Sequence, residues 1–153
     1  MFKLDTHVHT AETSNCGNVA AEELVHLYKG AGYDGIVITD HYYNWYFQSL
    51  QTDTWEDKIN TFLLGYNNAL KTGNQVDLTV LLGMEIRFTE NPNDYLVYGI
   101  DESFLLKNPE LYLYTIKEFK QLAEKNELLI YQAHPFRPNL IPMPAEMLDG
   151  YEV

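Results

Sequence analysis

Residues 35–39 read GIVIT, a short continuous apolar run without the alternation of a half-exposed strand. Such a run is typical of a parallel strand that is covered on both faces. Further strand-like runs cover residues 1–9, 78–86, 95–100 and 127–134, and segments with a helical period lie between several of them. This alternation of strands and helices predicts an α/β fold with a largely parallel sheet.

Three segments have the pattern of amphipathic helices. In the first, residues 18–32, Asn18 is the expected N-cap, and one face carries Leu24, Leu27, Tyr28 and Ala31. The second is expected from about Thr54, and the third from about Pro109, where proline suits a first helical turn. The aromatic segment at 40–50, DHYYNWYFQSL, is expected to be a loop.

The length of 153 residues suits one globular domain with a core of its own. It supplies four or five strand–helix units, whereas a complete eight-unit barrel typically needs ~200 residues or more. The last residues, DGYEV at 149–153, have the pattern of another strand that is just beginning. Two architectures therefore remain open, a small open sheet and the first part of a longer barrel.

Composition excludes some classes of function. The formal charge is −12, from 22 acidic and 10 basic residues, which argues against a broad nucleic-acid surface. No apolar stretch approaches the ~20 residues of a membrane span, and the first residues lack the pattern of a signal peptide. Cys16 is the single cysteine, so no intramolecular disulfide is expected. A cytoplasmic protein is the simplest interpretation.

Metal-ligating residue types recur where the predicted strands end. These residues are His7, His9, Asp40, His41, Glu85 and His134. The carboxyl ends of parallel strands meet at one rim, where α/β proteins bind ligands. On a strand, residues two apart point to the same side, so His7 and His9 can bind one ion together. The sequence therefore predicts a metal site at this rim.

The residue types also indicate which metals would bind. Imidazoles combined with a carboxylate suit zinc, iron or manganese better than calcium or magnesium. Glu85 has two carboxylate oxygens and can bridge two ions, and we expect Asp5 or Asp40 to accept a hydrogen bond from a ligand imidazole. Cys16 is interpreted as a bystander rather than an extra ligand. His26 lies off the apolar face of the first helix and is expected at the surface.

With these residues identified, the chain resembles the PHP family, the polymerase and histidinol phosphatase superfamily. The motifs that carry the resemblance are DTHVHT (5–10), GYDGIVITDH (32–41), GMEI (83–86) and AHP (133–135). The resemblance implies a partial, distorted (β/α)7 TIM-like barrel with two to three divalent ions (zinc, manganese or iron). It also implies five metal ligands, with Glu85 shared between two ions: His7, His9, His41, Glu85 and His134.

Three departures from the family pattern are visible. The family places a histidine after the third strand, where YLVYG here has Tyr95. A ligand of a third ion often lies in the loop that reads TSNCG in this chain, and the closing Asp-x-His motif is absent. The chain therefore resembles the first two thirds of such a barrel, and we expect residues 1–153 to be a single PHP domain that is incomplete at its C-terminal end.

The expected activity is metal-dependent hydrolysis of a phosphate monoester at a multinuclear site. Histidinol phosphate, a nucleotide or another phosphorylated small molecule would be the substrate. Asp40 is the expected orienting group, and Arg87 and Arg137 are candidates for binding the phosphate, although each is equally well interpreted as a surface residue. Two alternatives remain: a metal-dependent nuclease or phosphodiesterase, and a metal-binding but inactive fragment. The aromatic residues at 42–47 are expected either to wall a pocket or to pack in the core.

Overall fold

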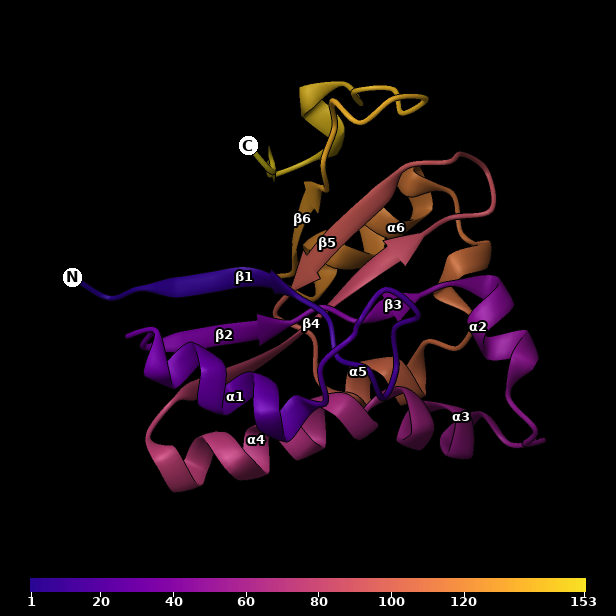
Figure 1. Cartoon of the computed structure of the whole chain (residues 1–153). Helices are drawn as coiled ribbons and strands as arrows, with labels where there is room; N and C mark the ends of the chain where they lie inside the picture. The colour runs from indigo at the N-terminus through magenta and orange to yellow at the C-terminus, as the bar shows by residue number, and fades with distance from the viewer.

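The computed structural model describes all residues, 1–153, and confirms an α/β fold built on one curled sheet (Figure 1). Its strands pair in the order β1-β2-β4-β5-β6-β7, and the short β3 pairs with β4. Their bounds are β1 Leu4–Val8, β2 Gly35–Ile38, β3 His41–Tyr42, β4 Thr79–Arg87, β5 Asp94–Tyr98, β6 Leu129–Gln132 and β7 Gly150–Tyr151. The sheet is that of a partial TIM-like barrel.

Helices cover the outside of the sheet. They are α1 Ala21–Gly30, α2 Asn44–Ser49, α3 Trp55–Phe62, α4 Leu64–Val76, α5 Glu102–Lys107 and α6 Ile116–Lys125. Figure 1 shows α1 and α4 side by side below β2, and α4 also packs against β4. None of these helices has the length and apolar character of a membrane span.

One strand runs against the others. β1, β2, β3 and β4 pair in parallel, as do β6 and β7, but β5 is antiparallel to both β4 and β6. Arg87, the last residue of β4, therefore pairs with Asp94, the first residue of β5. Since the direction is reversed, the beginning of β5 lies at the rim where the parallel strands end.

Two clusters of buried apolar side chains hold the layers together. The smaller cluster joins β1 and β2 to α1 and α4, through residues such as Val8, Leu24, Ile36 and Ala69. The larger cluster lies between the sheet from β3 to β6 and the remaining helices, and it includes Tyr42, Phe47 and Tyr95. All four residues of β2 are buried, as the apolar run at 35–38 predicts.

The first helix starts later than expected. It begins at Ala21, and Asn18 is not its cap: the Asn18 side chain donates to the Cys16 carbonyl instead. The carboxylate of Glu12 accepts from the Ala21 N–H at 3.0 and 3.1 Å. Glu12 therefore pairs a backbone N–H that has no partner inside the helix, and its negative charge complements the helix dipole. The apolar face also differs, because Val25 is buried and Leu27 is 57% exposed.

Three other expectations about helices are wrong. The helix from Thr54 is two helices, α3 and α4, which meet at Leu63. The segment expected as an aromatic loop contains α2, and α5 was not expected at all. The third helix begins after Thr115 rather than at Pro109, because Thr115 and Glu118 form a capping box that fixes its start.

Candidate metal centre

Four histidines and one glutamate meet at the rim of the sheet. They come from β1 and the residue after it (His7, His9), from β3 (His41), from β4 (Glu85) and from the turn after β6 (His134). These are the five ligands that the sequence predicts, and the structure brings all five side chains together. They line a cavity of about 340 Å³ together with Cys16, Tyr43, Arg87, Asp94 and Arg137.

Glu85 lies at the middle of the cluster and is 1% exposed. Its Oε2 lies 3.0 Å from His41 Nε2, 3.2 Å from His9 Nε2 and 3.5 Å from His7 Nε2. Its Oε1 lies 2.9 Å from His134 Nε2. Each histidine therefore turns the same ring nitrogen toward one carboxylate, and both carboxylate oxygens are used.

These separations fit a set of metal ligands. Two ligand atoms on one tetrahedral ion, each bonded at ~2.1 Å, are about 3.4 Å apart. The Nε2 atoms of His7 and His9 are 3.0 Å apart, and the contacts of Glu85 fall in the same range. Sets of donors close enough to share an ion are His7–His9–Glu85 and Glu85–Asp94–His134. Glu85 belongs to both sets, so its carboxylate is shared between them.

The charges in the cluster stabilise one another. Burial alone would raise the pKa of the Glu85 carboxyl, but hydrogen bonds with His134, His41 and the other two histidines outweigh it and hold that pKa well below its usual range. Burial would likewise lower the pKa of His7, yet the carboxylates of Glu85 and Glu152 raise it to about 9. A bound metal ion would take the place of the proton on His7 as the positive partner of these two carboxylates.

Glu152, next to β7, orients two of these histidines and was not predicted. Its Oε1 lies 2.7 Å from His7 Nδ1, and its Oε2 accepts from the His134 backbone N–H at 2.7 Å. Because this contact engages Nδ1, the Nε2 atom of His7 stays available to ligate a metal ion at the centre. His134 has a φ of 31°, a conformation uncommon for a residue other than glycine, and the hydrogen bond to Glu152 helps to hold it.

Asp94 is a second residue that sequence reasoning missed. Its Oδ2 lies 3.7 Å from His134 Nε2, and it is 1% exposed. The Arg87 guanidinium donates to both of its oxygens at 2.8 and 2.9 Å, and the Tyr43 hydroxyl donates to Oδ1 at 2.9 Å. Tyr95, which stands where the family pattern has a histidine, is buried in the core.

Asp40 does not contact a ligand imidazole at hydrogen-bond distance. Its Oδ1 is 4.0 Å from His9 Nδ1, while it accepts from the Thr10 N–H, the Thr10 hydroxyl and the Ser14 hydroxyl, each at 2.7 Å. It therefore fastens the loop after β1 to the end of β2. Asp5 also has other partners: it accepts from the His7 N–H and the Tyr28 hydroxyl.

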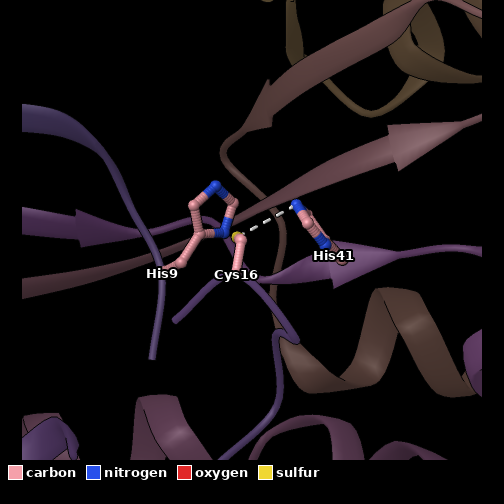
Figure 2. A group of neighbouring side chains, drawn as sticks. All are labelled: His9, Cys16 and His41. Carbon is pink, nitrogen blue, oxygen red and sulfur yellow. Dashed lines mark hydrogen bonds between the residues drawn. The ribbon is translucent and has the colours of Figure 1, made fainter. Parts of the chain in front are cut away.

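Cys16 lines the same cavity as the five expected ligands. Figure 2 shows its thiol turned toward the ring of His41, with His9 beside it. The Cys16 Sγ is 3.6 Å from His41 Nε2, and donor atoms of His9, Cys16 and His41 all lie within 4.8 Å of one another. Burial, with the carboxylate of Glu85 nearby, raises the pKa of the Cys16 thiol.

The two arginines have different surroundings. Arg87 is paired with Asp94, and its guanidinium lies 4.7 Å from the centre of the Tyr43 ring. Arg137 follows His134 in the turn after β6; it is exposed, lines the cavity and makes no ion pair. Of the aromatic residues at 42–47, Tyr42, Tyr46 and Phe47 pack in the core, and Tyr43 lines the cavity.

A family model for the PHP domain matches residues 5–150, nearly the whole chain. No curated protein matches the chain. Among solved structures, a two-domain protein from Bacteroides vulgatus that contains a predicted PHP-like metal-dependent phosphoesterase aligns with a TM-score of 0.64 at 20% identity. That alignment covers 95% of this chain and 40% of the other.

Two further structures are similar. One is a proposed metal-dependent phosphoesterase from Bifidobacterium adolescentis, with a TM-score of 0.64, 16% identity, and coverage of 99% of this chain and 77% of the other. The other is PsfC from Pseudomonas syringae, with a TM-score of 0.58, 17% identity, and coverage of 96% and 62%. The chain thus spans less than two thirds of the length of two of these three proteins.

Proposed function

The chain belongs to the PHP domain family, and from this premise we propose that it hydrolyses phosphate monoesters with two or three divalent ions held at the rim of its sheet. The observation that carries the proposal is the arrangement around Glu85. One buried carboxylate faces the Nε2 atoms of His7, His9, His41 and His134 at 2.9 to 3.5 Å. A structural site surrounds its ion with protein donors on all sides, whereas a hydrolytic centre keeps a position open to substrate, and this cluster lines an open cavity.

The donors around Glu85 fall into two sets in this proposal. His7 and His9 would hold one ion with Glu85, and His134 and Asp94 would hold a second through the other side of Glu85. When bound, the ions supply Lewis acidity toward phosphate oxygens and a water of lowered pKa. The protein holds these ligands in place through Glu152 on His7, through Arg87 on Asp94, and through Asp40 on the loop after β1.

Arg137 is the residue that would bind the substrate phosphate. It lines the cavity, and its guanidinium is not engaged by a carboxylate, so its donors are available for a bidentate contact with phosphate oxygens. Arg87 is a weaker candidate because both of its hydrogen bonds to Asp94 would have to break. We therefore assign Arg137 to binding the substrate phosphate and Arg87 to holding Asp94 in position.

The size and charge of the protein favour a small substrate. A cavity of about 340 Å³ lies at the lower end of the range for small-molecule sites. With a formal charge of −12 the protein would repel a polynucleotide unless a basic groove compensated, so a nuclease is the less favoured alternative. Histidinol phosphate or a mononucleotide remain the substrates we propose.

An aryl phosphate assay tests the proposal. We expect hydrolysis of an aryl phosphate monoester that requires added Mn²⁺ or Zn²⁺, and little hydrolysis of the matching bis-aryl diester. His7→Ala should lower kcat/KM by more than about 100-fold, since loss of an outer partner of a ligand already costs roughly 10–100-fold.

The control is His26→Ala, which removes a histidine on α1 away from the rim. It should leave the rate unchanged. Metal-dependent turnover that His7→Ala does not reduce would contradict the proposed site. Faster hydrolysis of the diester than of the monoester would favour the phosphodiesterase alternative.

A further inference from the structure

The loop that follows His134 has a defined shape. The Arg137 N–H donates to the His134 carbonyl at 3.0 Å, and the Leu140 N–H donates to the Arg137 carbonyl at 3.1 Å, so two turns follow each other. Four prolines, at positions 135, 138, 142 and 144, restrict the backbone of the same segment. The beginning of the loop is therefore fixed relative to His134.

Two buried side-chain amides fix the far end of this loop. The Asn93 Nδ2 donates to the Ile141 carbonyl at 2.8 Å, and the Ile141 N–H donates back to Asn93 Oδ1 at 3.1 Å. The Gln132 Nε2 donates to the same carbonyl at 3.0 Å, and the Met143 N–H donates to Gln132 Oε1 at 2.8 Å. Because both amides are buried, breaking one of these hydrogen bonds would leave a polar atom without a partner.

The two amides connect the loop to the metal centre. Asn93 directly precedes Asp94 at the start of β5, and Gln132 is the last residue of β6, two positions before His134. The loop between His134 and Ile141 carries Arg137, which is assigned above to the substrate phosphate. The segments that supply metal donors therefore also determine where Arg137 lies.

This fixed loop also holds an apolar ring in solvent. The side chain of Phe136, next to Arg137, is 82% exposed. It lines a second cavity, of about 360 Å³, which shares His134 and Arg137 with the metal cavity and therefore adjoins it. The residues that line this second cavity are His134, Pro135, Phe136, Arg137, Glu152 and Val153.

The groups that this second cavity offers to a ligand differ in kind. Both carboxylate oxygens of Glu152 are already engaged, one by His7 and the other by the His134 N–H. Arg137 has guanidinium donors that no carboxylate occupies, and Phe136 has an exposed aromatic face. A ligand that binds here would therefore combine an anionic group with a ring.

We propose that Phe136 contacts the leaving group of the substrate, and that Asn93 and Gln132 are positioning residues that hold Phe136 and Arg137 beside the metal centre. Arg137 binds the phosphate, and Phe136 packs against the group esterified to it. A planar aromatic or heterocyclic leaving group fits this wall better than a short alkyl group, because aromatic rings pack favourably against one another. The inference rests on the function proposed above and names the substrate class of that site.

Phosphonates test the contact with Phe136 without any hydrolysis. Phenylphosphonate and methylphosphonate present the same anionic group, and only the first carries a ring. In the Zn²⁺-loaded protein we expect phenylphosphonate to bind about 3- to 10-fold more tightly, as an aromatic pair contributes. Phe136→Ala should remove this difference and Phe136→Trp should keep it. Calorimetry measures the affinities, and metal analysis checks that each variant binds as much Zn²⁺ as the wild type.

Ile141→Ala is the matched control for Phe136→Ala. The Ile141 side chain is also apolar and exposed on this loop, but it lines neither cavity. This variant keeps the backbone groups that Asn93 and Gln132 bind, so it should retain the preference for phenylphosphonate. Loss of the preference in Ile141→Ala as well would contradict a specific contact with Phe136.

A double-mutant cycle tests the positioning role. Gln132→Leu removes two hydrogen bonds to the loop and should weaken binding of methylphosphonate, which has no ring and depends on Arg137. In an Arg137→Ala background the same change should matter by no more than about twofold, because the contact it misplaces is already gone. Unfolding curves check folding, and Gln132→Glu, which keeps the acceptor for Met143, replaces Gln132→Leu if that variant does not fold.

The outcomes separate this inference from the proposed function. Equal affinities of the wild type for both phosphonates, or a preference that Phe136→Ala does not reduce, would overturn the contact with the leaving group. An equal loss of affinity from Gln132→Leu in both backgrounds would overturn the positioning role. A preference that depends on Phe136 in a protein that does not hydrolyse aryl phosphate would support the contact and contradict the phosphatase.

Discussion

His7 shows how single contacts set the chemistry of the centre. Its Nδ1 is 2.7 Å from Glu152, and its Nε2 faces Glu85 and His9. A metal ligand must be a neutral imidazole, but the two carboxylates overcome the opposing effect of burial and raise the pKa of His7 from 6.5 to about 9. An ion must therefore displace a proton from His7 over most of the neutral range.

We predict that metal affinity rises with pH up to about 9 and then levels off, because the competing proton on His7 is lost there. Glu152→Gln removes one of the two carboxylates, so the pKa of His7 should fall and the plateau should begin at a lower pH. Zinc competition titrations between pH 6 and 10 measure both curves, and calorimetry in two buffers counts the released proton. A wild-type affinity that does not change with pH would contradict the prediction.

The same shift has a consequence for the stability of the metal-free protein. Because the pKa of His7 is higher in the folded state than its ordinary value of 6.5, the ion pair contributes fully below pH 6.5 and is lost as the pH rises through about 9. Measuring the free energy of unfolding at a series of pH values would detect this loss. In His7→Ala the free energy of unfolding should no longer fall over this pH range.

The two arginines should respond differently to substitution. Arg137→Ala removes a charge-assisted contact worth ~1.5–3 kcal/mol, so kcat/KM for an aryl phosphate should fall by roughly 10–100-fold, mainly through KM. Arg87→Ala should weaken metal binding, because Asp94 loses its bidentate partner, while KM at saturating ion stays near the wild-type value. Steady-state kinetics over a range of Mn²⁺ concentrations separates the two effects. Equal KM changes in both variants would contradict this division of roles.

At the scale of helices and strands, the sequence allowed the parallel strands and their polar ends to be predicted. The apolar runs that became β1, β2, β4 and β6 each have metal-ligating residue types at or just after their ends, so a single rule predicted where these residues lie. They are His7 and His9, His41, Glu85, and His134. Asp94 lies at the beginning of a strand, and only the antiparallel direction of β5 brings it to the rim. No periodicity in the sequence reveals strand direction.

Other elements could not be predicted because distant residues determine them. Glu12 rather than Asn18 caps α1, although it lies nine residues before Ala21. The short helices α2 and α5 have too few turns for a helical period to stand out. Glu152 follows the two-residue strand β7, and its role depends on β7 lying parallel to β6 and close to β1.

Gly65 is the point at which α4 approaches the loop after β1. A Cβ there would overlap Thr10 Oγ1 and lie 3.0 Å from Asp40 Oδ2. We predict that Gly65→Ala destabilises the protein by about 1–3 kcal/mol through this overlap, despite the better helix propensity of alanine. The expected fall in Tm is roughly 2–10 °C for a domain of this size.

Gly30 in α1 is the matched control. It is also a helical glycine, but a Cβ there would meet nothing within 4 Å. Gly30→Ala should leave Tm unchanged or raise it slightly, since it gains up to about 1 kcal/mol of helix propensity. Similar Tm values for the two variants would show that the approach of α4 to Thr10 is not tight.

At the scale of the whole molecule, the centre joins both ends of the fold. Its residues come from β1, β3, β4, β5 and the segments next to β6 and β7, and the Tyr98 hydroxyl on β5 also donates to the Thr6 carbonyl on β1 at 3.0 Å. An ion bound there contacts strands that are separated in the sheet order. Metal binding should therefore stabilise the complete fold rather than one element.

We predict that Zn²⁺ at about 100 times its Kd adds ~2.7 kcal/mol to the free energy of unfolding, which corresponds to a rise in Tm of roughly 5–10 °C. Thermal unfolding with chelator and with excess Zn²⁺ measures the difference. Glu85→Gln should abolish most of it, and His26→Ala should preserve it. Identical Tm values in chelator and in Zn²⁺ would rule out an ion at the centre.

The contact between His7 and Glu152 spans 145 positions of the chain. During synthesis on the ribosome, His7 and His9 leave the exit tunnel early, the carboxylate of Glu85 follows much later, and that of Glu152 later still. A nascent chain therefore exposes a histidine pair long before it can enclose an ion. Metal content should therefore report whether residues 7 to 152 have folded together, and not merely whether the histidine pair has been made.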